Sequence, residues 1–268
     1  MNTHILQKKS YSPKYSSKKI LIDGTEWQYY DLGKGKKTLV IFPNILLFPQ
    51  EWLEYVKVFD KTYRVIIPVY PPLSDYRLMV RQLHTLLHLL QVKRFVLLGN
   101  SIGGMFAQAY SVSYPEDVEK LILLATIAPS KGYGSLVRML SVIGHMVPST
   151  LVQAFVAFGI AISLTKSEEN RKKWGPLLKK HISHKGTKLS ILSLAGCIYS
   201  FCFGLKEEIK QKVPLTIIDA QKDAVFPFIF QNLSKIYPQA VYYSIPNAKH
   251  LVEINKKESL VQILQALI

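Results

Sequence analysis

Short apolar runs alternate with amphipathic segments along most of the chain. Six runs have the length of a buried strand, at residues 38–42, 63–69, 94–99, 118–126, 213–220 and 240–245. Segments with apolar residues at helical spacing accompany them, at 51–59, 78–90, 103–114 and 258–267. Apolar strands without polar alternation, joined by helices, are typical of a parallel sheet covered on both faces. The pattern therefore predicts an α/β protein whose chemistry lies in the loops that follow the strands.

The interval 129–212 interrupts this alternation, because it is helical in pattern and shows no convincing strand. Its window 146–164 has no charged residue over a membrane-spanning length. Spanning a membrane there would separate two strands of one sheet, so we favour a pair of lid helices, with membrane contact as the alternative. We therefore predict an α/β core at 20–128 and 213–268, a helical lid at 129–212 and a basic tail at 1–19.

Composition places the 268-residue chain among folded proteins, with 49% hydrophobic and 19% charged residues. Its two cysteines, Cys197 and Cys202, are too few for a disulfide framework, and we expect two buried thiols. The first 19 residues are basic but lack the apolar segment of a secretory signal. Together these features favour a cytoplasmic location.

The formal net charge of +16 indicates attraction to an anionic partner, or simply solvated lysine-rich faces. No recognisable motif or aromatic-basic interleaving supports nucleic-acid binding. One basic cluster follows the apolar window and consists of Lys166, Arg171, Lys172, Lys173, Lys179 and Lys180. The possible partners are an acidic acyl-carrier protein or an anionic membrane surface.

A G-x-S-x-G sequence, Gly99-Asn100-Ser101-Ile102-Gly103, lies between a predicted strand and a predicted helix. In that context the serine occupies a tight, strained turn, so the residues two positions away must be small. Gly99 and Gly103 meet this need, and the turn aims the N-terminus of the following helix at any oxyanion formed there. Ser101 is therefore the candidate nucleophile.

The segment 99–125 resembles the elbow, helix and next strand of the α/β-hydrolase superfamily, including the helix ending at Tyr114-Pro115. The resemblance covers most of the chain from about Ile20 onward, with 129–212 the least comparable part. It implies the α/β-hydrolase fold, a mostly parallel central sheet flanked by helices with an inserted helical lid. It also implies that an acid and a histidine follow the serine in that chain order.

Two residues match those positions. Asp223 follows the strand 213–220, and His250 lies between the last strand and the last helix. In such a triad the histidine takes the proton of the serine hydroxyl, while the aspartate fixes the tautomer of the imidazole. Asp219 falls within the strand end, so we expect it to point elsewhere.

No metal site and no cofactor is predicted. His84 and His88 are four residues apart on a predicted helix, but neither a third ligand nor an intervening glutamate accompanies them.

Two loops depart from the family pattern. Pro43-Asn44 replaces the usual His-Gly, and residues 69–72 replace the usual Asp-x-x-Gly pattern. Backbone N–H groups do not depend on side-chain identity, so we expect Ile45 and Ile102 to form the oxyanion hole. Both loops are similar to the maspardin branch of the superfamily, whose members are regarded mainly as binding proteins.

We therefore expect a serine hydrolase that cleaves an ester or thioester of an apolar acyl group through an acyl-enzyme. The alternative is a weakly active or inactive binding protein on the same fold.

Overall fold

The computed structural model describes residues 15–44, 50–164, 167–183, 186–205, 212–225 and 230–268. Most of the predicted tail 1–19 therefore lies outside the described residues, and the first strand begins at Lys18.

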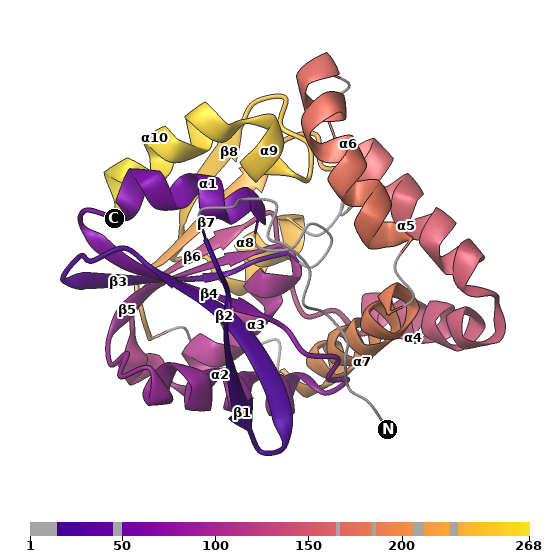
Figure 1. The fold of residues 1–268 in the computed structure, drawn as a ribbon, viewed down its shortest axis with the longest axis horizontal. Coiled ribbons are helices and arrows are strands. Elements are labelled where there is room, and N and C mark those ends of the chain that lie inside the picture. The colour runs from indigo at the N-terminus through magenta and orange to yellow at the C-terminus, as the bar shows by residue number, and fades with distance from the viewer. Residues whose placement is uncertain (1–14, 45–49, 165–166, 184–185, 206–211, 226–229) are drawn as a thin grey trace.

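Eight strands form one sheet in the order β1-β2-β4-β3-β5-β6-β7-β8 (Figure 1). Their bounds are β1 Lys18–Ile22, β2 Thr25–Leu32, β3 Lys37–Phe42, β4 Tyr63–Val69, β5 Phe95–Asn100, β6 Val118–Leu124, β7 Leu215–Ala220 and β8 Val241–Ile245. β1 pairs with β2, and β2 with β4, in antiparallel register, while the remaining pairs are parallel. The predicted fold class, with a mostly parallel sheet flanked by helices, is confirmed.

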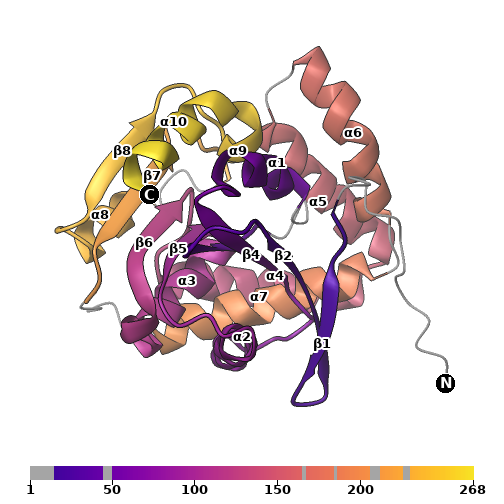
Figure 2. The same ribbon diagram turned by 60° about the vertical axis from the view of Figure 1, so that its left-hand side comes forward.

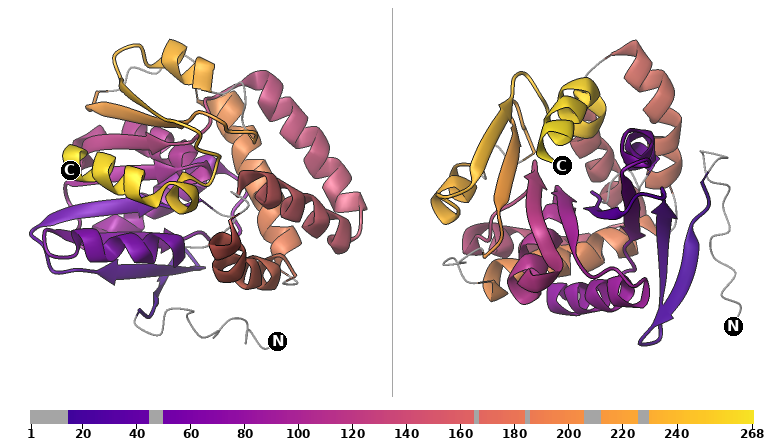
Figure 3. Two further views of the ribbon diagram at one scale, coloured as in Figure 1. Left: turned by 90° about the horizontal axis from the view of Figure 1, so that it is seen from above. Right: turned by 90° about the vertical axis from the view of Figure 1, so that its left-hand side faces the viewer.

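Helices cover both faces of the sheet, as Figures 1 and 3 show. One face carries α2 (Tyr76–Leu89), α3 (Ile102–Ser113) and α8 (Phe230–Ile236), and the other carries α1 (Gln50–Phe59), α9 (Val252–Asn255) and α10 (Lys257–Leu267). Alternate residues of β3 point to opposite faces, as a strand requires. Val40 and Phe42 join the core under α2 and α3, and Leu39 and Ile41 join the core under α1 and α10.

Four helices lie between β6 and β7 along the chain and stand to one side of the sheet (Figures 1 and 2). They are α4 (Lys131–Met146), α5 (Ser149–Ser163), α6 (Glu168–Ile182) and α7 (Thr187–Gly204), here called the cap helices. The window 146–164 carries one helix, α5, instead of the expected pair. The preceding helix ends at Met146, at the start of the window, and Pro148 is the N-cap of α5. α5 then continues through Gly159 without interruption, so no second helix forms.

The strongly apolar character of α7 was not recognised from the sequence. Among the described helices, α7 is long and apolar enough to cross a membrane by length and composition alone. It packs against α4 and also contacts α2 and α3, with Cys197, Phe201 and Cys202 buried. α7 is therefore packed against the rest of the protein along one side. The two cysteines lie on that side and are free and buried, as expected.

Candidate active site

Ser101 occupies a strained turn between β5 and α3. Its backbone lies at φ 53° and ψ −120°, a region that a residue with a side chain rarely adopts. Two hydrogen bonds hold it there: the Ser101 N–H donates to the Leu124 carbonyl at 2.9 Å, and the Thr126 hydroxyl donates to the Ser101 carbonyl at 2.5 Å. Thr126 could not be recognised from the sequence, because its contact with Ser101 depends on the pairing of β5 with β6.

The glycines on either side of Ser101 have no room for a side chain. A Cβ at Gly99 would lie 2.6 Å from the Ala107 Cβ. A Cβ at Gly103 would lie 2.0 Å from the Phe42 carbonyl oxygen, so the elbow packs directly against the end of β3. The requirement for small residues at these positions therefore comes from sheet and helix backbone.

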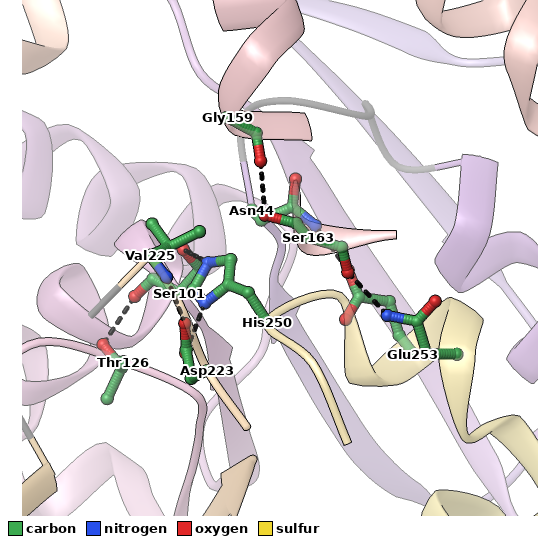
Figure 4. Close-up of polar contacts among 10 residues, drawn as sticks. Asn44, Ser101, Thr126, Gly159, Ser163, Asp223, Val225, His250 and Glu253 are labelled. Carbon is green, nitrogen blue, oxygen red and sulfur yellow. Dashed lines mark hydrogen bonds and ion pairs between the residues drawn. The ribbon is translucent and has the colours of Figure 1, made fainter. Parts of the chain in front are cut away.

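The three residues predicted as a triad lie together in the structure (Figure 4). His250 Nε2 is 2.9 Å from Ser101 Oγ, and His250 Nδ1 is 2.7 Å from Asp223 Oδ2. Asp223 Oδ1 accepts a further bond from the Val225 N–H at 2.8 Å. The His250 side chain is only 2% exposed, so this chain of hydrogen bonds is shielded from water.

The loops that carry the acid and the base are tied to each other. The Lys222 N–H donates to the Ala248 carbonyl at 2.8 Å, and the Gln221 side chain accepts from the Asn247 N–H at 3.0 Å. Asn247 has a positive φ of 56°, which asparagine tolerates better than most residues. These contacts fix the distance between Asp223 and His250.

Asp219 lies within β7, as expected, and no hydrogen bond joins it to His250 among the described residues. Burial raises its pKa to about 6, and the negative charge of Asp223 adds to this shift. The structure therefore places Asp223, and not Asp219, against the histidine.

The predicted oxyanion donors are described only in part. Ile102 is the first residue of α3, so its backbone N–H has no acceptor within the helix. Ile45 lies outside the described residues. The two loops that depart from the family pattern contact each other, because the Tyr70 hydroxyl donates to the Pro43 carbonyl at 3.1 Å.

A buried acidic pair lies beside this loop and was not foreseen from the sequence. The Asn44 amide donates to Glu253 Oε1 at 2.7 Å (Figure 4). It also donates to Glu51 Oε1 at 3.2 Å. Burial raises the pKa of Glu51 well above its usual range, and the neighbouring Glu253 charge adds to this. Burial also raises the pKa of Glu253 to about 7, although His250 and the Asn44 hydrogen bond lower it. Asn44 thus joins the loop after β3 to the helix that follows His250.

The raised pKa of Glu253 predicts a pH-dependent stability. The folded protein keeps this proton to a higher pH than the unfolded chain, so stability falls as pH rises from about 4.5 to about 7. The slope from this group is at most about 1.4 kcal/mol per pH unit. Glu253→Gln should flatten the curve of unfolding free energy against pH, measured by urea denaturation. The exposed Glu258→Gln is the matched control and should leave the slope unchanged; an unaltered slope in Glu253→Gln would refute the assignment.

The remaining histidine and lysine candidates have other surroundings. The His84 ring stacks on the Tyr114 ring, with 3.8 Å between the ring centroids. His84 Nε2 lies 3.5 Å from Asp117 Oδ2. Within the described part of the chain, no group of three or more His, Cys, Asp or Glu residues could hold a metal ion. Of the basic cluster, Lys166 and the side chains of Arg171 and Lys180 lie outside the described residues.

The cap helices are anchored to the loop that carries His250. The Lys249 ammonium donates to the Leu164 carbonyl at 3.1 Å, and the Asn255 amide donates to the Ser163 carbonyl at 2.7 Å. Lys173 of α6 also forms an ion pair with Glu54 of α1. The end of α5 is therefore held beside the candidate base.

Comparison with known proteins supports the same family. A family model described as the alpha/beta hydrolase fold matches residues 63–178, which include Ser101 but neither Asp223 nor His250. A 2-hydroxy-6-oxononadienedioate/2-hydroxy-6-oxononatrienedioate hydrolase of Paraburkholderia phymatum is 35% identical over 121 residues. That match covers 39% of this chain and 42% of the relative, so the chain matches less than half of that relative's length.

Two longer matches are more distant in sequence. The AB hydrolase superfamily protein YisY of Bacillus subtilis is 27% identical, over 69% of this chain and 70% of the relative. The crystal structure of the enol-lactonase from Burkholderia xenovorans superposes with a TM-score of 0.77 at 16% identity, over 93% of this chain and 98% of the other. Residues 63–178 therefore match the alpha/beta hydrolase family in sequence, and the chain as a whole has the α/β-hydrolase fold.

Proposed function

We propose that the chain is a serine hydrolase that cleaves an ester or thioester of an apolar acyl group. The observation that carries this proposal is the buried hydrogen-bonded chain from Ser101 through His250 to Asp223. A serine hydroxyl is a poor nucleophile by itself, and this arrangement supplies the base that it needs.

In the acylation step, Ser101 Oγ attacks the carbonyl carbon of the substrate while His250 Nε2 accepts the hydroxyl proton. Asp223 accepts the hydrogen bond from His250 Nδ1 and stabilises the imidazolium that forms. The bond from carbon to the alcohol oxygen or thiol sulfur then breaks, and the leaving group takes the proton from His250. Water repeats the sequence on the acyl-enzyme and releases the acid.

The negative charge on the carbonyl oxygen requires hydrogen-bond donors that are already in place. The Ile102 N–H at the start of α3 is one proposed donor, assisted by the helix dipole. Ile45 remains the proposed second donor. Removing one such donor costs about 2.7–4 kcal/mol in the transition state of a well-studied serine protease.

An apolar substrate group is proposed from a groove in the cap helices. An open groove of about 400 Å³ lies between α5 and α6, and its apolar lining includes Ala157, Ile160, Ala161, Leu164 and Ile182. The Leu164 carbonyl accepts a hydrogen bond from the side chain of Lys249, the residue that precedes His250 in the sequence. A groove of this character suits an acyl or alkyl chain.

The proposal is tested by measuring the hydrolysis of esters and thioesters of increasing acyl length. Wild type should turn over at least one series, and Ser101→Ala should lose about 10⁴-fold or more in kcat because no other group can form the acyl-enzyme. Equal turnover by the two proteins would overturn the proposal. The competing hypothesis of an inactive binding protein predicts no turnover by either.

A further inference from the structure

The helix α4 presents large apolar side chains to solvent. Six of them are between 43% and 82% exposed: Leu136, Met139, Leu140, Val142, Ile143 and Met146. Residues three and four apart share one face of a helix, so these side chains form a continuous stripe. The opposite side packs on α7, where a Cβ at Gly134 would meet Cys202 and one at Gly144 would meet Leu192.

The next helix, α5, repeats this arrangement. Leu151, Phe155 and Phe158 are 58%, 68% and 64% exposed, at positions i, i+4 and i+7. The other side of α5 is buried through Val152, Val156 and Ile160. We call the exposed apolar side chains of α4 and α5 the outer cap face.

The outer cap face lies in a part of the chain without acidic residues. No aspartate or glutamate occurs from Lys120 to Ser167, and residues 129–212 contain thirteen lysines or arginines against four glutamates. Lys131 at the start of α4 is exposed. Lys172 and Lys179 are also exposed, on α6, the helix that packs against the buried side of α5. Lys188 of α7 donates to the Val147 carbonyl at 2.6 Å, at the connection between the two helices.

Exposed phenylalanine and leucine side chains in this number indicate a surface that is covered in use. A second copy of the chain would bring two positive surfaces together, so charge opposes self-association. An acidic carrier protein would attract the lysines, but its polar surface would not bury the apolar side chains of Phe155 and Phe158. A bilayer with anionic lipids meets both requirements. Its acyl chains bury the apolar side chains, and its anionic headgroups attract the lysines.

We propose that the outer cap face is a docking surface for an anionic lipid bilayer. The helices lie on the membrane and do not cross it, because the inner sides of α4 and α5 are packed within the protein. This inference goes beyond the proposed function and does not depend on catalysis.

The test is co-sedimentation with vesicles of phosphatidylglycerol and phosphatidylcholine, compared with phosphatidylcholine alone. Wild type should bind the anionic vesicles more tightly, and added salt should weaken binding because the headgroup contacts are electrostatic. Phe155→Glu/Phe158→Glu should lower the affinity by about tenfold or more. Met139→Glu/Ile143→Glu on α4 should do the same, so the result does not rest on the folding of one variant.

Leu21→Glu is the matched control, because Leu21 is 69% exposed on β1, outside the cap helices, and should bind as wild type does. Ser101→Ala should also bind normally, which separates this test from that of the hydrolase proposal. Four outcomes would overturn the inference: no binding of wild type to anionic vesicles, undiminished binding by both double variants, a dimer that the double variants abolish, or binding to an acidic carrier protein without binding to vesicles.

Discussion

Asp223→Asn is expected to lower kcat by about 10⁴-fold, whereas Asp219→Asn should leave it close to wild type. The Asp223 carboxylate accepts from His250 Nδ1 at 2.7 Å and thereby leaves Nε2 free to take the serine proton. An asparagine amide can donate to Nδ1 instead, which places the imidazole proton on Nε2. The base would then be blocked, although the geometry would survive.

Asp219 is a close control for this experiment. It lies four residues earlier, at the end of β7, and is half-buried, which raises its pKa. The measurement is kcat of both variants on one substrate, with circular dichroism to confirm folding. The opposite ranking, with Asp219→Asn the inactive variant, would show that the acid has been assigned wrongly.

Gly103→Ala should destabilise the protein by about 3 kcal/mol or more and abolish most of its activity. The added methyl group would lie 2.0 Å from the Phe42 carbonyl oxygen and 2.5 Å from that of Pro43. Both atoms belong to backbone, so the clash is relieved only by moving the elbow away from β3. That movement separates Ser101 from His250 and displaces the loop that precedes Ile45.

Gly159→Ala is the control for Gly103→Ala, because it makes the same substitution inside another helix. Nothing lies within 4 Å of a Cβ at Gly159, inside α5, so alanine should stabilise the protein by up to about 1 kcal/mol. Urea unfolding midpoints of the two variants measure the difference. A Gly103→Ala protein as stable as wild type would mean that the close packing of elbow and β3 is not needed.

Several features could be predicted from the sequence because they depend on local patterns. The buried strands are continuous apolar runs, and the elbow needs small residues two positions from Ser101. For the strands and the elbow, residues near each other in sequence carry the information. Asp223 and His250 were instead predicted from the resemblance to the α/β-hydrolase superfamily, in which an acid and a histidine follow the serine in chain order.

Other features depend on contacts between distant segments and could not be predicted. Asn44 and Glu253 are 209 residues apart, so the local sequence around either residue does not predict their hydrogen bond. The same holds for the Tyr70 hydroxyl on the Pro43 carbonyl, which links the two unusual loops. Apolar spacing on α4 and α5 indicates a face, but only the packing shows which face is exposed.

The contact between Tyr70 and Pro43 gives a physical reason for the departures from the family pattern to occur together. Tyr70 from the loop after β4 supports the carbonyl of Pro43, and Asn44 is held by the buried acids. The loop after β3 is thus anchored on two sides without the usual His-Gly. We expect this anchoring to position the Ile45 N–H.

The most direct test of the proposed nucleophile is reaction with a fluorophosphonate probe, followed by mass spectrometry of the intact protein and of its peptides. The hydrogen-bonded chain from Ser101 to Asp223 predicts one covalent adduct per wild-type molecule, located on Ser101, and none on Ser101→Ala. An unmodified wild-type protein, or an adduct on another residue, would contradict the account and favour a binding role for the fold.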